Sequence, residues 1–302
     1  MAFPVPPSRL PDEVVAKARQ FGPGAQTPAE PRDAATVVLV RPGEEPAGGP
    51  EVYLLLRRRS MAFAAGMAVF PGGGVDPRDF DARPGPDTWA GPSPDDWAAR
   101  LGVGPDEAVA LVCAAVRETF EESGVLLAGP SADEVVADTT GPDWEADRLA
   151  LELHEVAFTD LLARHGLVLR TDLLGVWDAW LTPEFEPRRY RTWFFVAVLP
   201  EGQRTRDVST ESVSVLWEPA ATAVERCERG DLAMMPPTYL TCLDVAQHAD
   251  PAAVLAAARE RRAEMFMPQL EPYAGGEGFS LTMPDRLRPV VARRRALREG
   301  AS

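Results

Sequence analysis

The pattern of hydrophobic and polar positions predicts strands early in the chain, a long helix in its middle, and a mixture of both afterwards. Runs rich in aliphatic and β-branched residues predict strands at 35–40, 51–57, 176–181, 192–199 and 213–217. Helical periodicity predicts a helix over 106–123, and the spacing of Leu149, Leu153, Val156 and Leu161 predicts another. The last third is expected to be mainly helical, at 219–229, 238–247 and 251–263, with a loop-rich tail.

These elements alternate without a regular βαβ rhythm, so the predicted fold class is α+β, with helices packed on a mixed sheet. Residues 1–33 are rich in proline and form a loosely attached lead-in with a short helical pattern at 11–19. A main domain is expected over 34–250, with insertions at 76–105 and 128–175, followed by an extension over 251–302. The first insertion is crowded with proline, aspartate and glycine, which favours a surface excursion with a short helix at 95–101.

Composition and charge exclude several classes of protein. A net charge of −15 argues against a surface that grips nucleic-acid backbone. No apolar run approaches the roughly 20 residues that span a bilayer, and the first residues do not resemble a signal peptide. The three widely spaced cysteines, Cys113, Cys227 and Cys242, are typical of the cytoplasm and do not form a zinc motif. The sequence does not determine the oligomeric state, and a homodimer is one of the alternatives.

Three glutamates near the end of the central helix are the strongest chemical signal. Glu118, Glu121 and Glu122 share one helix face, where like charges repel by roughly 0.2–0.5 kcal/mol per pair. A solvated acidic face is the alternative explanation, but a site for Mg²⁺ would turn this repulsion into affinity, since Mg²⁺ binds carboxylates together with substrate phosphates. Arg117 is placed to hold a carboxylate, and Gly124 is a natural helix C-cap.

Residues 117–125 resemble the second half of the Nudix box, whose pattern is Gly-x5-Glu-x7-Arg-Glu-U-x-Glu-Glu-x-Gly-U, with U aliphatic. The segment 70–73 is similar to the strand and turn that open the box, which makes Gly73 its first glycine. The resemblance implies a Nudix fold, with a mixed sheet between helices. It also implies that Glu118, Glu121 and Glu122 bind Mg²⁺ or Mn²⁺, that Arg117 orients a carboxylate, and that the Gly73 carbonyl joins the metal ligands.

The chain departs from the box by an insertion. Gly73 and Glu118 are 45 positions apart, whereas the box separates them by 15, so about 30 residues are inserted. Counted back from Arg117, the first glutamate of the box falls on Val109. A similar interruption occurs in the coenzyme A diphosphatase-like branch of the superfamily, which residues 113–127, 187–195, 217–219 and 235–238 also resemble.

The resemblance implies a hydrolase that cleaves the diphosphate of a nucleoside-diphosphate-linked metabolite. A coenzyme A signature of a neighbouring Nudix group is matched by Arg57 and Gly66 but not by Leu55, Arg58 and Ala62. Coenzyme A or acyl-coenzyme A is therefore one candidate substrate, and ADP-ribose or NADH is the alternative. A Nudix module that senses a ligand without catalysis also stays open.

Further candidates for the site lie outside the box. Arg57 and Arg58 end a strand and are suited to bind phosphate, or else they are solvated. The cluster of Arg188, Arg189 and Tyr190 offers cations and a stacking face for an adenine, or else a solvated strand flank. The resemblance suggests Glu211 as an extra metal ligand or a general base; Glu121 is the alternative base.

Overall fold

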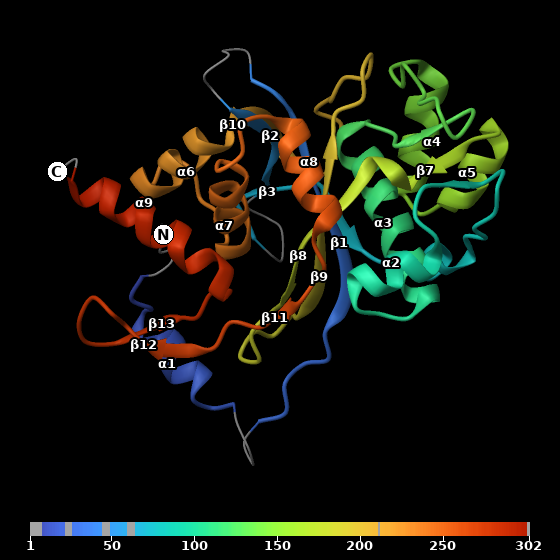
Figure 1. Ribbon diagram of the computed structural model, residues 1–302. Helices are drawn as coiled ribbons and strands as arrows, with labels where there is room; N and C mark the ends of the chain where they lie inside the picture. Colours follow the sequence, from blue (N-terminus) through green and yellow to red (C-terminus); the bar gives the residue numbers. More distant parts are fainter. Residues whose placement is uncertain (1–7, 22–25, 44–48, 59–63, 211, 301–302) are drawn as a thin grey trace.

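The computed structural model describes residues 8–21, 26–43, 49–58, 64–210 and 212–300. A mixed sheet lies between two groups of helices (Figure 1). Its strands, in spatial order, are β10 (Ser212–Pro219), β2 (Pro50–Arg57), β1 (Arg32–Pro42), β9 (Tyr190–Val198), β8 (Leu174–Leu181) and β11 (Met265–Phe266). Pairing is parallel between β1 and β9 and between β8 and β11, and antiparallel between the other neighbours. Two short strands extend the sheet: β3 (Ala68–Val69) pairs with β2, and β4 (Gly72–Gly74) with β1.

Strand β1 is hydrophobic along most of its length because both of its faces are covered. Val37 and Leu39 belong to one core and Val38 and Val40 to the other, as expected for side chains that alternate across a sheet. The first core is covered by α2 (Pro94–Leu101) and α3 (Pro105–Ser123). The second is covered by α6 (Ala220–Arg229), α7 (Pro236–Val245), α8 (Pro251–Glu260) and α9 (Arg288–Gly300). The predicted strands, the helix at 106–123 and the α+β class are confirmed.

A smaller unit packs beside α3. Strands β5 (Trp89–Ala90), β7 (Val168–Arg170) and β6 (Ala128–Gly129) form a three-stranded sheet, accompanied by α4 (Pro142–Glu152) and α5 (Phe158–His165). The single helix predicted from Leu149 to Leu161 is wrong, because the chain leaves α4 at Leu153 and takes a positive φ of 57° at His154. The side chains of Leu149 and Leu153 are 39% and 65% exposed. Their helical spacing therefore did not mark a buried face.

Segments near the two ends of the described chain are in contact. The predicted N-terminal helix is confirmed as α1 (Asp12–Ala18), and it lies beside the hairpin β12 (Leu270–Pro272) and β13 (Phe279–Leu281) (Figure 1). The backbone N–H of Leu10 donates to the carbonyl of Phe279 at 2.7 Å. The expected loop-rich tail is confirmed over 261–287, which holds only short strands and a 3₁₀ turn, but helix α9 at its end was not predicted. Within the described residues, no helix is long and apolar enough to cross a membrane.

Residues 76–105 are only partly a surface excursion. The segment begins with a 3₁₀ turn at Pro77–Asp81, and α2 then packs against α3. Trp97 is fully buried, its ring centroid lies 6.0 Å from that of Phe195, and its Nε1 donates to Thr171 Oγ1 at 3.3 Å. Leu101 is 2% exposed. The high content of Pro, Gly and Asp predicted a surface excursion, but it gave no information on Trp97 and Leu101, which anchor the segment in the core.

Replacing Trp97 tests this anchoring. Trp97→Ala should lower the free energy of unfolding by about 3–5 kcal/mol, because it removes a buried indole and leaves a cavity. Asp95→Ala, on the exposed side of the same helix, should change it by less than about 0.5 kcal/mol. Urea denaturation of the two variants measures both values, and equal stability would show that α2 is not part of the core.

Candidate functional site

The three glutamates lie in the last turns of α3 and line one large cavity. The cavity has a volume of about 1620 Å³, and Glu118, Glu121 and Glu122 form part of its wall. The helix stops directly after them, because Gly124 adopts a φ of 74° and its N–H donates to the Phe120 carbonyl at 2.9 Å. The predicted C-cap is confirmed, and it ends the helix at the cavity.

Arg117 is buried behind these glutamates, and each of its donors has an acceptor. Nε and Nη2 donate to the two oxygens of Asp79 at 3.0 and 2.9 Å. Nη1 donates to Glu118 at 2.7 Å and to Glu121 at 3.1 Å, and Nη2 also donates to the Gly74 carbonyl at 2.9 Å. A guanidinium has five N–H groups, so none of them is left for another partner. This side chain fixes the orientation of two of the three glutamates.

Asp79 was missed by the sequence analysis, which looked for the first acid of the box at Val109. Val109 is instead a core residue, 5% exposed. A count from the other end of the motif would have found it: forward from Gly73, the glutamate of the pattern Gly-x5-Glu falls on Asp79. The insertion therefore follows the first acidic position, between Asp79 and Arg117. Asp79 is 2% exposed and forms a bidentate ion pair with Arg117.

The glycine turn packs directly against the glutamates, as predicted. A Cβ added to Gly73 would stand 2.5 Å from Glu118 Oε1, so a side chain at this position would displace that carboxylate. The N–H of Gly72 donates to Glu122 Oε2 at 2.7 Å. Because β4 pairs with β1, the central sheet fixes the position of this turn relative to α3.

The electrostatics of the cluster favour an added positive charge. Burial raises the pKa of Glu118 to about 7, and it also raises the pKa of Glu121, although Arg117 opposes the shift in both. One guanidinium thus only partly offsets the cost of burying these carboxylates. Across the described ranges, no three acidic, histidine or cysteine side chains are arranged as a group that could hold a metal ion. The carboxylates of Glu118, Glu121 and Glu122 are nevertheless the type of ligand that a hard cation takes together with water and substrate.

Another carboxylate that lines the same cavity, Glu152, was not predicted. It accepts hydrogen bonds from Arg148 Nη1 at 2.9 Å and from the N–H and hydroxyl of Thr210 at 2.9 and 2.6 Å. Arg148 is almost fully buried and also donates to the Glu121 carbonyl at 2.7 Å. In the sequence, Arg148 and Glu152 look like an ordinary ion pair on a helix surface, so no signal distinguished them. They connect α4 to the end of α3.

The candidates for substrate binding separate into two groups. Arg57 and Tyr190 line the cavity, whereas Arg58, Arg188 and Arg189 do not. Arg58 donates to the Ser212 carbonyl at 3.1 Å, and Arg188 is exposed.

Arg189 is buried and has a structural role, because it donates to the carbonyls of Thr182 and Ala29, each at 3.0 Å. Glu211 lies outside the described residues.

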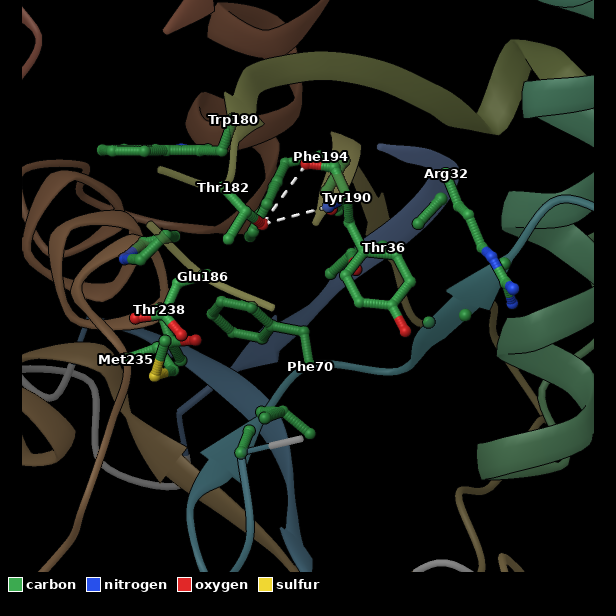
Figure 2. A pocket seen from close by; sticks show the side chains of 18 of the residues that line it. Arg32, Thr36, Phe70, Trp180, Thr182, Glu186, Tyr190, Phe194, Met235 and Thr238 are labelled. Carbon is green, nitrogen blue, oxygen red and sulfur yellow. Dashed lines mark hydrogen bonds between the residues drawn. The ribbon is translucent and has the colours of Figure 1, made fainter. Parts of the chain in front are cut away.

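An unpredicted cation, Arg32, also lines the cavity. Arg32 and Tyr190 are register partners in the parallel pairing of β1 with β9. Figure 2 shows their side chains on one side of the pocket and Trp180 and Met235 on the other, with Phe70 between. Tyr190 is held by its neighbour Thr182, whose hydroxyl accepts from the Tyr190 N–H at 3.1 Å.

The buried pair of Asp79 and Arg117 can be tested without a substrate. Asp79→Ala should lower the free energy of unfolding by about 3–5 kcal/mol, because it leaves a buried guanidinium without its main partner. Asp81→Ala, on the same turn but exposed, is the matched control. Unfolding is measured in a metal chelator, so that a bound cation does not contribute. Equal stabilities would mean that Arg117 does not depend on Asp79.

Comparisons with known proteins agree with this geometry. Residues 94–243 match the family described as NUDT19 Nudix domain. Acyl-coenzyme A diphosphatase NUDT19 of Gallus gallus is 30% identical over 249 residues, which are 69% of this chain and 66% of that protein. Its Homo sapiens counterpart is 28% identical over 225 residues, 64% of this chain and 60% of that protein. The match thus spans less than two thirds of each of these relatives.

A solved structure supports the fold independently. The crystal structure of a NUDIX hydrolase from Alicyclobacillus acidocaldarius superposes with a TM-score of 0.62 at 26% identity, covering 76% of this chain and 96% of that one. The box residues around Arg117, the mixed sheet between helices and these likenesses lead to one assignment. The chain belongs to the Nudix hydrolase superfamily and is similar to its coenzyme A diphosphatase-like branch.

Proposed function

We propose that this protein hydrolyses the diphosphate of a nucleoside-diphosphate-linked metabolite, with coenzyme A or an acyl-coenzyme A as the substrate. The observation that carries the proposal is the wall of the cavity formed by Glu118, Glu121 and Glu122, with Arg117 bonded behind them. The names of the relatives support the choice of substrate. A module that only senses a ligand would not require this cluster of repelling charges.

Mg²⁺ or Mn²⁺ is the proposed cofactor, with Glu118, Glu121, Glu122 and the Gly73 carbonyl as its ligands. The raised pKa values of Glu118 and Glu121 support it, since a nearby cation would restore the charged form of both. When bound, the ion would neutralise charge on the diphosphate oxygens.

The residues of the chain supply the rest of the mechanism. Glu121 is the proposed general base, and it would take a proton from the water that attacks phosphorus; Glu211 is the alternative. Arg117 holds the Glu121 carboxylate in position through the 3.1 Å hydrogen bond. The leaving group departs as a phosphate ester.

With coenzyme A as substrate, the products would be 3′,5′-ADP and 4′-phosphopantetheine, because the site acts on the diphosphate and not on a thioester. A panel of coenzyme A, ADP-ribose, NADH and dinucleoside polyphosphates with Mg²⁺ or Mn²⁺ distinguishes the substrates. Turnover of ADP-ribose or NADH alone would replace coenzyme A by the alternative substrate class. Binding of these compounds without any turnover would instead support a sensing module.

Glu121→Gln and Glu122→Gln test the carboxylates. Each variant keeps the shape of the side chain and removes its charge, so kcat should fall on the order of 10²–10⁴-fold while the fold survives. A chelator should abolish the activity of the unmodified protein. Asp106→Asn, in the exposed first turn of the same helix, is the control and should keep full activity. Full turnover by both glutamine variants would contradict the assignment.

Arg57→Ala tests the proposed contact with substrate phosphate. A charge-assisted hydrogen bond contributes about 1.5–3 kcal/mol, so the KM for coenzyme A should rise roughly tenfold or more. Arg188→Ala, at an exposed arginine that does not line the cavity, is the comparison. If Arg188→Ala raises the KM and Arg57→Ala does not, the phosphates bind near Arg188 rather than near Arg57.

A further inference from the structure

The cavity extends well beyond the glutamates and changes character as it does so. Its volume of about 1620 Å³ exceeds the roughly 300–1,000 Å³ of ordinary small-molecule sites. The far part, here called the apolar chamber, is lined by Val14, Trp180, Phe194, Met235, Leu281 and Met283. Figure 2 shows Trp180 and Met235 on the side of the pocket away from Arg32, and Phe194 in the middle beside Tyr190. A nucleoside diphosphate needs no apolar surface of this kind.

Two segments far apart in the sequence, α1 and β13, form the end wall that closes the chamber. Val14 belongs to α1, and Leu281 to β13. They are held together by the bond from the Leu10 N–H to the Phe279 carbonyl, and the Arg19 guanidinium lies 4.8 Å from the centre of the Phe279 ring. Both segments lie outside residues 94–243, which match the family description.

The charges around the cavity indicate which way a substrate lies. The arginines that line its described part, Arg32 and Arg57, lie on β1 and β2. The polar groups toward the end wall include two carboxylates, Glu13 and Glu186. Lys17 approaches Glu186 at 3.6 Å, but it does not line the cavity. Asp33, Asp76, Glu152 and the three glutamates also line the cavity, so phosphates are favoured near Arg32 and Arg57 only once a cation is bound. The apolar side chains of the chamber then favour the uncharged tail.

We propose that the apolar chamber binds the acyl chain of an acyl-coenzyme A, and that the end wall of α1 and β13 sets the longest chain that fits. This inference rests on the proposed function. Each methylene that enters the chamber leaves water and should raise kcat/KM up to about fourfold. Once the chain reaches the end wall, further methylenes should give no gain or a loss.

The experiment measures kcat/KM of the full-length protein with Mg²⁺ for free, acetyl-, hexanoyl-, dodecanoyl- and hexadecanoyl-coenzyme A. Leu281→Trp and Val14→Trp fill the chamber from its two walls. Gln269→Trp, directly before β12, and Ala16→Trp, on α1, add the same side chain at exposed positions that do not line the cavity. The effect is measured as a ratio of kcat/KM between chain lengths within each variant, so it does not depend on how much active protein each preparation contains.

We expect kcat/KM of the unmodified protein to rise with chain length and then to level off or fall. The variants that fill the chamber should reach this limit at a shorter acyl chain. In them, the ratio of kcat/KM for the longest substrate to kcat/KM for the shortest should fall at least tenfold below that of the unmodified protein. The control variants should keep the original profile. Leu281→Ala should move the limit to longer chains, which provides a test if a tryptophan variant does not fold. Equal kcat/KM for all chain lengths, or unchanged profiles in these variants, would show that the chamber does not bind the acyl chain. The proposed diphosphatase activity would then still stand. Turnover of ADP-ribose with no coenzyme A species cleaved would overturn both.

Discussion

The buried guanidinium of Arg117 joins the two separated halves of the site. It reaches the Gly74 carbonyl and Asp79 on one side of the insertion, and Glu118 and Glu121 on the other. A buried cation is stable only when its hydrogen bonds are complete, so the positions of these four partners depend on one another. The glycine turn, the 3₁₀ turn and the end of α3 consequently behave as one unit, although the chain between them is long.

That unit explains how an insertion is tolerated in the middle of a metal-binding motif. Lengthening a connection costs little free energy once its ends are fixed, because the entropy of loop closure grows only slowly with length. Here the ends are fixed by the ion pair at Asp79 and by the packing of α2 on α3, where Trp97 fills the core. The inserted residues thus add helix α2 and strand β5 without displacing the glutamates.

The sequence predicted the parts of the fold that are determined locally. The helix that carries Glu118, Glu121 and Glu122 and its cap at Gly124 follow from periodicity and from the conformational freedom of glycine. The role of Arg189 did not follow, because its acceptors at Ala29 and Thr182 are distant in sequence or lie across a turn.

The same limit applies to the cavity. Glu152 and Arg32 come from segments whose pattern is that of a solvated surface, and only the pairing of β1 with β9 and the docking of α4 bring them to the site. Asp79 differs, since a count forward from Gly73 would have found it. What could not be predicted is thus mainly which distant segments meet.

The contact between Leu10 and Phe279 also has a consequence for how the protein is made. Strand β1 needs β9 as its partner, 158 positions later in the register from Arg32 to Tyr190. The cavity needs α1 and β13 together. A chain emerging from the ribosome can therefore form the helix with its glutamates long before the last wall of the cavity exists. During that interval the apolar lining around Phe194 and Met235 lacks its cover. That cover forms only after residues near Met283 have left the ribosome.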